Sequence, residues 1–524
     1  MLAQRVVLIA AASMLFAACV GEGAVEVSLQ LPEDPDLSPM NLSIGEITLI
    51  TTMPDKPVRS ESHQVVDPSL GVNLGRVDVG EGIQLTLSMN SPSQRLVGFG
   101  RSGIVDVDAE DTVTVPINLR RPFVYMTGGT AITAFDSTQE QGRPSYQSAI
   151  MVDGNPVVVV PTPDGEDLAV VAVGGAGASL VLVSTSTHLQ RQEIAGIPLG
   201  PFPTDAAVSP DNRFLVVAHE ENPGGTGGLA IIDLAAARAG ASRIQFVPLD
   251  GVTGVTVAGG RAFALLNRAT TYGCDQAIMS SIVVVELETG AVGSTVSFAH
   301  GIHDMAVAAD GRTVVVADAC DNGLLRFDVD NGEPTQLLAN LQDASAVAIV
   351  GDRVWGVGTQ PPNVNSGATL ELVFIPIDGG PGDETSVKLP PTEERAESDM
   401  FDEQGQSAQQ VLDADEVMAY ELAVVPGSGH VALLTRSRFS GTESGSLGGF
   451  PIIPSMDMDS WEYLLVEASS ATVFQRQRTR CQVSWDSSSL PWLDSWICGS
   501  LSSQDVLDNP GYEPLRISVL YGSR

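Results

Sequence analysis

A short hairpin pattern recurs along most of the chain and limits its possible folds more than any other feature. Alternating apolar residues run into an Asp-Gly type of turn, and a second apolar run follows at once, as in MAVAADGRTVVVADAC at residues 305–320. Period-two alternation on both sides of a tight turn predicts a β-hairpin. The turns of the copies are centred on Gly165, Asn212, Gly260, Gly311, Asp352 and Gly429.

The hairpins recur about every 40–50 residues, with further strands between them, which is typical of a β-propeller. Second strands are predicted at residues 123–126, 168–173, 214–218, 262–266, 313–317, 354–357 and 431–434. The first of these runs lacks a strand before its turn, and the alternating segment RISVLY at residues 516–521 supplies it. We therefore expect an all-β chain whose residues 121–524 form a seven-bladed β-propeller closed by the C-terminal strand.

The phrases PTPDGEDLAVVAV at residues 161–173 and VSPDNRFLVVA at residues 208–218 resemble the YVTN family of bacterial β-propellers. The literal tetrapeptide is absent, so the resemblance is to the broad superfamily. It implies either a binding protein of the cell surface or periplasm, or a lactonase-like enzyme, because a fold alone does not fix a function.

The first 18 residues have the features of an export signal: Arg5, a short apolar run, and a small-small-Cys ending at Cys19. The ending resembles the lipobox of bacterial lipoproteins, which implies cleavage before Cys19 and a lipid anchor in the membrane. An ordinary secretory signal cleaved near Ala18 is the alternative. Val20 favours the outer membrane as the location in the cell envelope.

Residues 19–23 provide the lipidated cysteine and a spacer, and residues 24–120 read as short strands between polar turns. This segment resembles prealbumin-like or Ig-like modules, which implies a small N-terminal β-sandwich domain. A spacer between anchor and propeller is the expected role, with ligand binding as the alternative.

The net charge of −37 argues against nucleic acid as a partner, because binding to phosphates depends on Lys and Arg. It equally argues against an electrostatic hold on anionic lipid. The acidic surface is consistent with an exported protein that stays soluble.

Four cysteines follow Cys19, and an even number in an exported chain favours disulfides. Cys274 and Cys320 follow the second strands of neighbouring repeats, so their turns should meet and the thiols should pair. Cys481 and Cys498 lie in one segment and should pair locally. Free buried thiols are the alternative.

Two segments interrupt the repeat. Residues 379–416 are strongly acidic and predict a mobile loop, with cation binding as the alternative. Residues 481–511 are rich in Cys and Trp and predict a disulfide-stapled loop that covers the ring, with an aromatic platform for a sugar or peptide as the alternative.

The sequence offers no motif for a catalytic residue, a metal or a cofactor. His300 and His303 have metal-like spacing, but residues three apart on a strand point to opposite faces. Asp205, His303 and Asp304 are instead predicted at the rim of the central channel, where propellers bind ligands.

The expected function is therefore a non-enzymatic binding or scaffolding surface that recognises a protein or a cell-envelope polymer. The alternative is a lactonase-like hydrolase that uses Asp205, His303 and Asp304 with a metal.

Overall fold

The structure is a computed structural model that describes most of the chain between residues 24 and 519. The described residues are 24–53, 56, 58–65, 80–108, 112–128, 131–138, 149–175, 177–194, 197, 203–220, 227–270, 274–321, 323–330, 333–360, 368–390, 393–401, 407–413, 416–425, 430–441, 446–447, 450–451, 456–469, 472–485 and 517–519. Within these ranges, strands dominate, and the one α-helix is the short α1 (Leu234–Arg238). The predicted all-β class is confirmed.

Seven antiparallel sheets of four strands follow residue 121 in the described part of the chain. The first three are β38 (Ile517–Val519), β7 (Phe123–Gly128), β8 (Ala131–Asp136), β9 (Ile150–Met151); β10 (Asn155–Pro161), β11 (Asp167–Gly174), β12 (Gly177–Ser184), β13 (Gln190–Ile194); and β14 (Pro203–Val208), β15 (Phe214–His219), β16 (Gly228–Asp233), β17 (Ile244–Pro248). The next two are β18 (Val252–Ala258), β19 (Arg261–Leu266), β20 (Ser281–Glu286), β21 (Val292–Ser297); and β22 (Asp304–Val307), β23 (Thr313–Asp318), β24 (Gly323–Asp328), β25 (Thr335–Ala339). The last two are β26 (Ala346–Val350), β27 (Arg353–Gln360), β28 (Thr369–Pro376), β29 (Thr385–Lys388); and β32 (Glu416–Val424), β33 (His430–Gly441), β36 (Met456–Glu467), β37 (Thr472–Trp485). Every run predicted as a second strand lies in the second strand of its sheet.

The first strands of these sheets contact one another in a closed cycle. Strand β38 touches β10, the contacts continue through β14, β18, β22 and β26 to β32, and β32 touches β38 again. Strand β38 also pairs antiparallel with β7, where Ile517 lies opposite Met126. This arrangement is a β-propeller, and the C-terminal strand occupies the place predicted for it.

The apolar runs form strands that are buried on both faces because each sheet packs between two neighbours. One core cluster, for example, joins Leu180 and Val171 of the second sheet to Leu215 and Ile232 of the third. The residues between β10 and β11 turn through Gly165, whose φ of +65° lies in the left-handed region that glycine adopts without cost.

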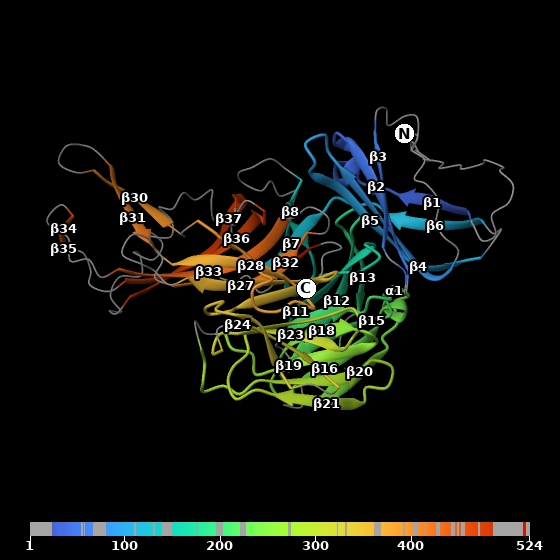
Figure 1. The fold of residues 1–524 in the computed structure, drawn as a ribbon. Coiled ribbons are helices and arrows are strands. Elements are labelled where there is room, and N and C mark those ends of the chain that lie inside the picture. The colour runs from blue at the N-terminus through green and yellow to red at the C-terminus, as the bar shows by residue number, and fades with distance from the viewer. Residues whose placement is uncertain are drawn as a thin grey trace.

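The N-terminal unit contains two sheets around one core of its own. Its strands are β1 (Ala24–Gln30) parallel to β6 (Thr112–Asn118), and the antiparallel order β3 (Arg59–Gln64), β2 (Glu46–Thr52), β4 (Gly80–Asn90), β5 (Leu96–Val107). Two 3-10 turns, η1 (Pro35–Leu37) and η2 (Pro39–Asn41), connect β1 to β2. Figure 1 shows these blue strands gathered at one side of the larger set of sheets.

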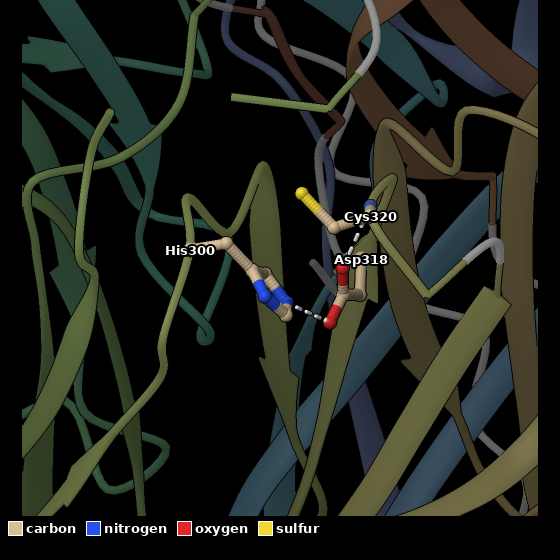
Figure 2. Close-up of side chains that lie close together, drawn as sticks. All are labelled: His300, Asp318 and Cys320. Carbon is tan, nitrogen blue, oxygen red and sulfur yellow. Dashed lines mark hydrogen bonds and ion pairs between the residues drawn. The ribbon is translucent and has the colours of Figure 1, made fainter. Parts of the chain in front are cut away.

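Cys274 and Cys320 form a disulfide, as predicted. The bond joins the loop after β19 to the turn after β23, and so links two neighbouring sheets. Cys320 lies beside Asp318 and His300 (Figure 2). Cys498 lies outside the described residues, as do residues 1–18, Cys19 and the spacer, so those predictions stay predictions.

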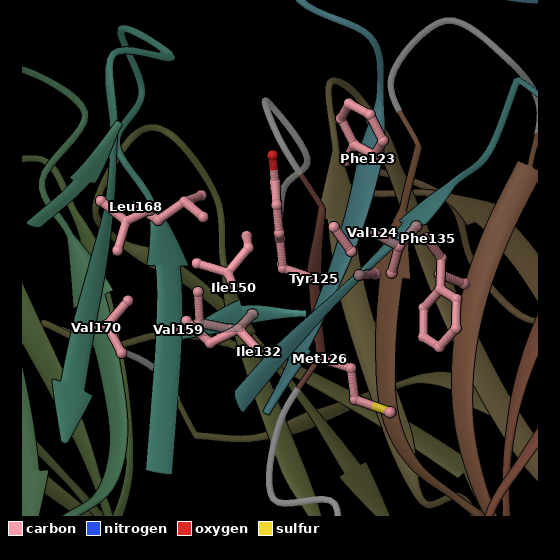
Figure 3. Packing of buried hydrophobic residues seen from close by; sticks show 14 of the residues in the cluster. Phe123, Val124, Tyr125, Met126, Ile132, Phe135, Ile150, Val159, Leu168 and Val170 are labelled. Atoms are coloured by element: carbon pink, nitrogen blue, oxygen red, sulfur yellow. The ribbon is translucent and has the colours of Figure 1, made fainter. Parts of the chain in front are cut away.

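The boundary between the two units is a buried joint rather than an open linker. Arg120 and Arg121 are buried, and Arg121 donates to the Ser38 carbonyl oxygen at 3.0 and 3.1 Å while its Nη1 lies 3.1 Å from Asp136 Oδ2. Figure 3 shows the adjoining side chains of the first sheet, among them Phe123 and Tyr125, which belong to one core cluster. The same cluster includes Leu37 and the β5 residues Leu96 and Phe99, so the units share a core.

Two predicted loops are partly wrong. Residues 379–416 contain β29 and a hairpin of β30 (Glu393–Phe401) and β31 (Ser407–Asp413). Backbone pairing does not require apolar side chains, so acidic composition alone did not exclude strands. The segment 481–511 begins inside β37, which runs to Trp485 and pairs with β36, while its residues 486–511 lie outside the described residues, so the prediction for them stays a prediction. A further short pair, β34 (Ser446–Leu447) and β35 (Phe450–Pro451), projects with β30 and β31 away from the N-terminal unit (Figure 1).

Candidate functional site

A small cavity lies where the first strands of several sheets meet at the centre of the ring. Its volume is about 20 Å³. Its lining residues are Asp205, Gly254, Val255, Thr256, Leu265, Arg268, Asp304, Met305, Val347, Glu421 and Leu422. They come from β14, β18, β19, β22, β26 and β32 and from the loop after β19.

Strand register explains why acidic side chains face this cavity. In six sheets, one residue of the first strand pairs with the fifth residue of the second strand. These equivalent residues are Val158, Asp205, Gly254, Asp304, Ala346 and Glu421. Strands β14 and β32 each have a register shift just before this position, and the two shifts place Asp205 and Glu421 at equivalent points of the ring.

Asp205 and Asp304 make the same contact, each with the next sheet. Asp205 Oδ2 accepts a hydrogen bond from the Val255 N–H at 3.0 Å, and Asp304 Oδ2 accepts one from the Val347 N–H at 3.0 Å. A carboxylate that accepts a backbone N–H at a buried or half-buried position stabilises that pairing more than a neutral acceptor would. The two aspartates therefore hold neighbouring first strands together.

Arg268 crosses the cavity and connects three sheets. Its Nη1 lies 3.5 Å from Glu421 Oε1, and its Nη2 donates to the Tyr420 carbonyl oxygen at 3.0 Å. Its Nε donates to the His303 carbonyl oxygen, and its guanidinium carbon lies 5.3 Å from the centre of the Tyr420 ring. Both charged side chains of the Arg268–Glu421 pair are only 7% exposed, so the pair is screened little by water.

The three residues predicted at the channel rim have different places. Asp205 and Asp304 line the cavity together, whereas His303 is buried outside its lining and contributes its backbone carbonyl to Arg268. The Nε2 of His300 lies 2.7 Å from Asp318 Oδ2. Arg268 and Glu421 were not predictable from sequence, because 153 positions separate them and no local pattern marks either.

The cavity brings three carboxylates and one guanidinium together in a space for about one water molecule or one bare ion. Pockets for small organic molecules typically measure roughly 300–1,000 Å³. The geometry thus provides electrostatic cohesion at the centre of the ring.

Within the described ranges, none of the helices has the length and apolar character needed to cross a membrane.

Comparisons with known proteins return only distant likenesses in structure. No family model matches the sequence, and no curated protein matches it significantly. Solved structures that are similar include hydrazine synthase of Kuenenia stuttgartiensis, at 15% identity and a TM-score of 0.36, over 55% of this chain and 77% of that one. The WD40 repeats of RRP9 are similar at 11% identity and a TM-score of 0.37, over 56% and 78% of the chains, and U3-55K at 12% and 0.36, over 56% and 79%. These scores are too low to support a conclusion on function.

Proposed function

We propose that this chain is an exported lipoprotein whose seven sheets are the blades of one propeller that serves as a binding or scaffolding surface. The ligand is a protein or a polymer of the cell envelope. The proposal combines the export signal and Cys19 with the closed cycle of first strands. In it, Cys19 anchors the chain in a membrane, on the outer-membrane side of the envelope.

The charged contacts at the centre of the ring are the observation that carries this proposal. Arg268 spans a cavity of about 20 Å³, and the carboxylates of Asp205 and Asp304 are already engaged with backbone N–H groups. A hydrolase of the lactonase-like type would need those groups to be available to a metal and a substrate. The outer surfaces of the blades remain for recognition, and a macromolecular ligand suits such surfaces.

The hydrogen bonds at the joint between the units support the proposal that the N-terminal unit holds the propeller in a fixed orientation. Asn118 Nδ2 donates to the Asp164 carbonyl oxygen at 3.0 Å, and the Glu33 N–H donates to Ser186 Oγ at 2.6 Å. With Arg120 bound to Thr185 Oγ1 at 3.0 Å, the N-terminal unit is fixed to the second sheet as well as the first. We propose that this unit is a rigid spacer that holds the propeller in one orientation above its anchor.

Binding and hydrolysis can be separated with one preparation of the full chain. It is tested for cosedimentation with purified envelope polymer, for capture of envelope proteins, and for hydrolysis of a lactone panel with added divalent ions. We expect saturable binding to one envelope component and no metal-dependent hydrolysis. Metal-dependent lactone hydrolysis that is lost in Asp304→Asn would contradict the proposal.

The anchor has a separate test. The Cys19→Ala variant is expected to move from the membrane fraction to the soluble fraction of the envelope, because it lacks the acylated thiol. Retention of the variant in the membrane fraction would show that the lipobox interpretation is wrong.

A further inference from the structure

Four side chains with metal-ligating atoms meet at the joint between the fourth and fifth sheets. They are Cys274, His300, Asp318 and Cys320, and none of them lines the central cavity. One ligand atom each from His300, Asp318 and Cys320 lies within 4.8 Å of the other two, and Cys274 is bonded to Cys320. Figure 2 shows the His300 ring and the Asp318 carboxylate directed at each other, with Cys320 beside them.

We propose that these four residues form a zinc site when the Cys274–Cys320 disulfide is reduced. Two thiolates, one imidazole and one carboxylate complete a tetrahedral set, with bonds of about 2.3 Å to sulfur and about 2.0–2.2 Å to nitrogen and oxygen. Thiolates favour Zn²⁺ over Ca²⁺ or Mg²⁺. In the disulfide neither sulfur is a thiolate, so only His300 and Asp318 remain and the oxidised chain lacks the site.

The positions of the ligands do not depend on the disulfide alone. Asp318 is fully buried, and its Oδ1 accepts hydrogen bonds from the N–H groups of Cys320 at 2.9 Å and Asp321 at 3.0 Å. Its Oδ2 lies 2.7 Å from His300 Nε2, so the two ligand atoms already face each other, and Zn²⁺ would take the place of the hydrogen bond between them. These contacts place Asp318, His300 and the Cys320 backbone in either redox state.

Backbone hydrogen bonds also hold the Cys274 loop against the His300 loop. The Gly301 N–H donates to the Asp275 carbonyl oxygen at 2.9 Å, and the Ser280 N–H donates to the His300 carbonyl oxygen at 3.2 Å. Reduction therefore frees the two sulfurs without releasing the segments that carry them. Cys274 is exposed, so a reductant reaches the bond.

The redox step balances with an external dithiol or phosphine as the reductant. Its two electrons break the S–S bond and two protons give two thiols, while a dithiol becomes a disulfide or a phosphine takes oxygen from water. Zn²⁺ then replaces the two thiol protons, which are released to solvent.

The test uses the full chain with Cys19, Cys481 and Cys498 each replaced by Ser, so that Cys274 and Cys320 are the only cysteines. Zn²⁺ binding is measured by competition with a chromogenic chelator before and after phosphine reduction, and Co²⁺ is used to record thiolate-to-metal absorption. We expect one Zn²⁺ per reduced chain and affinity at least about 100-fold weaker in the oxidised chain.

Variants separate a four-ligand site from simple thiol binding. His300→Ala and Asp318→Asn should each weaken Zn²⁺ binding to the reduced chain by at least about tenfold, while His63→Ala, in the N-terminal unit, should leave it unchanged. Equal affinity before and after reduction would overturn the proposal. Unchanged affinity in His300→Ala, or binding only by a reduced chain that has lost its circular dichroism, would overturn it as well.

Discussion

Arg268 joins three sheets of the ring through one guanidinium, and Glu421 is its charged partner. Removing one member of a buried pair leaves the other charge without compensation, which typically costs about 3–5 kcal/mol. Arg268→Ala should therefore lower the free energy of unfolding by about that amount in urea titrations.

A surface pair provides the control for this prediction. Arg243 lies 3.7 Å from Asp233 and its side chain is 79% exposed, so Arg243→Ala should change stability by less than about 0.5 kcal/mol. Similar effects of Arg268→Ala and Arg243→Ala on the free energy of unfolding would show that the contacts of Arg268 across the cavity contribute little to stability.

His188 makes the contact between the first and second sheets sensitive to pH. Its Nε2 lies 3.1 Å from the Tyr125 hydroxyl, and burial lowers the pKa of the imidazole from 6.5 to about 4. The unfolded chain thus binds the proton first as the pH falls. The stability that the neutral ring contributes is complete above pH 6.5 and is lost as the pH falls toward 4, by about 3 kcal/mol in all.

The His188→Asn variant isolates this effect, since asparagine tolerates the φ of +54° at this position. Urea titrations between pH 7.5 and pH 4 should show a loss of stability in the unsubstituted chain that exceeds the loss in the variant. The same pH dependence in both chains would contradict the assignment.

At the scale of elements, the turns of neighbouring hairpins contact one another. Gly311 has a φ of +64°, and a Cβ there would lie 2.8 Å from the Gly259 Cα. Gly311→Ala should cost about 1–3 kcal/mol from backbone strain and the clash together.

Gly260→Ala is the matched control, because Gly260 has a φ of +76° but open space around its Cβ position. This variant should show the backbone strain alone. If the two substitutions lower the melting temperature equally, the turns at Gly259 and Gly311 are not in close contact.

The hairpins were predictable from sequence because alternation and turn chemistry are local signals. Strands β30 and β31 were missed because their acidic composition resembles that of a loop. At the centre, Asp205 and Asp304 were predicted since each stands near the start of a first strand. The partners that decide the chemistry, Arg268 and Glu421, are brought together by closure of the ring, and local sequence carries no signal for that.

At the scale of the whole molecule, two features connect the separate hairpins into one cooperatively folded structure. The first is the shared core at the joint, where Leu37 and Phe99 pack into the same cluster as Phe123. The second is β38, which places the last described strand beside the first strand that follows the N-terminal unit. Contacts that join distant parts of a chain make unfolding cooperative, so both features should unfold with the ring.

Closure of the ring by β38 is the central claim, and deletion of residues 516–524 tests it most directly. The deletion would expose the edge of β7, which pairs with β38, and would remove the contacts of β38 with β10 and β32. Differential scanning calorimetry of the full chain should show one main transition for the propeller. The deleted chain should lose this transition or unfold in several broader steps at lower temperature. A deleted chain with the same melting temperature and enthalpy as the full chain would contradict the closed ring.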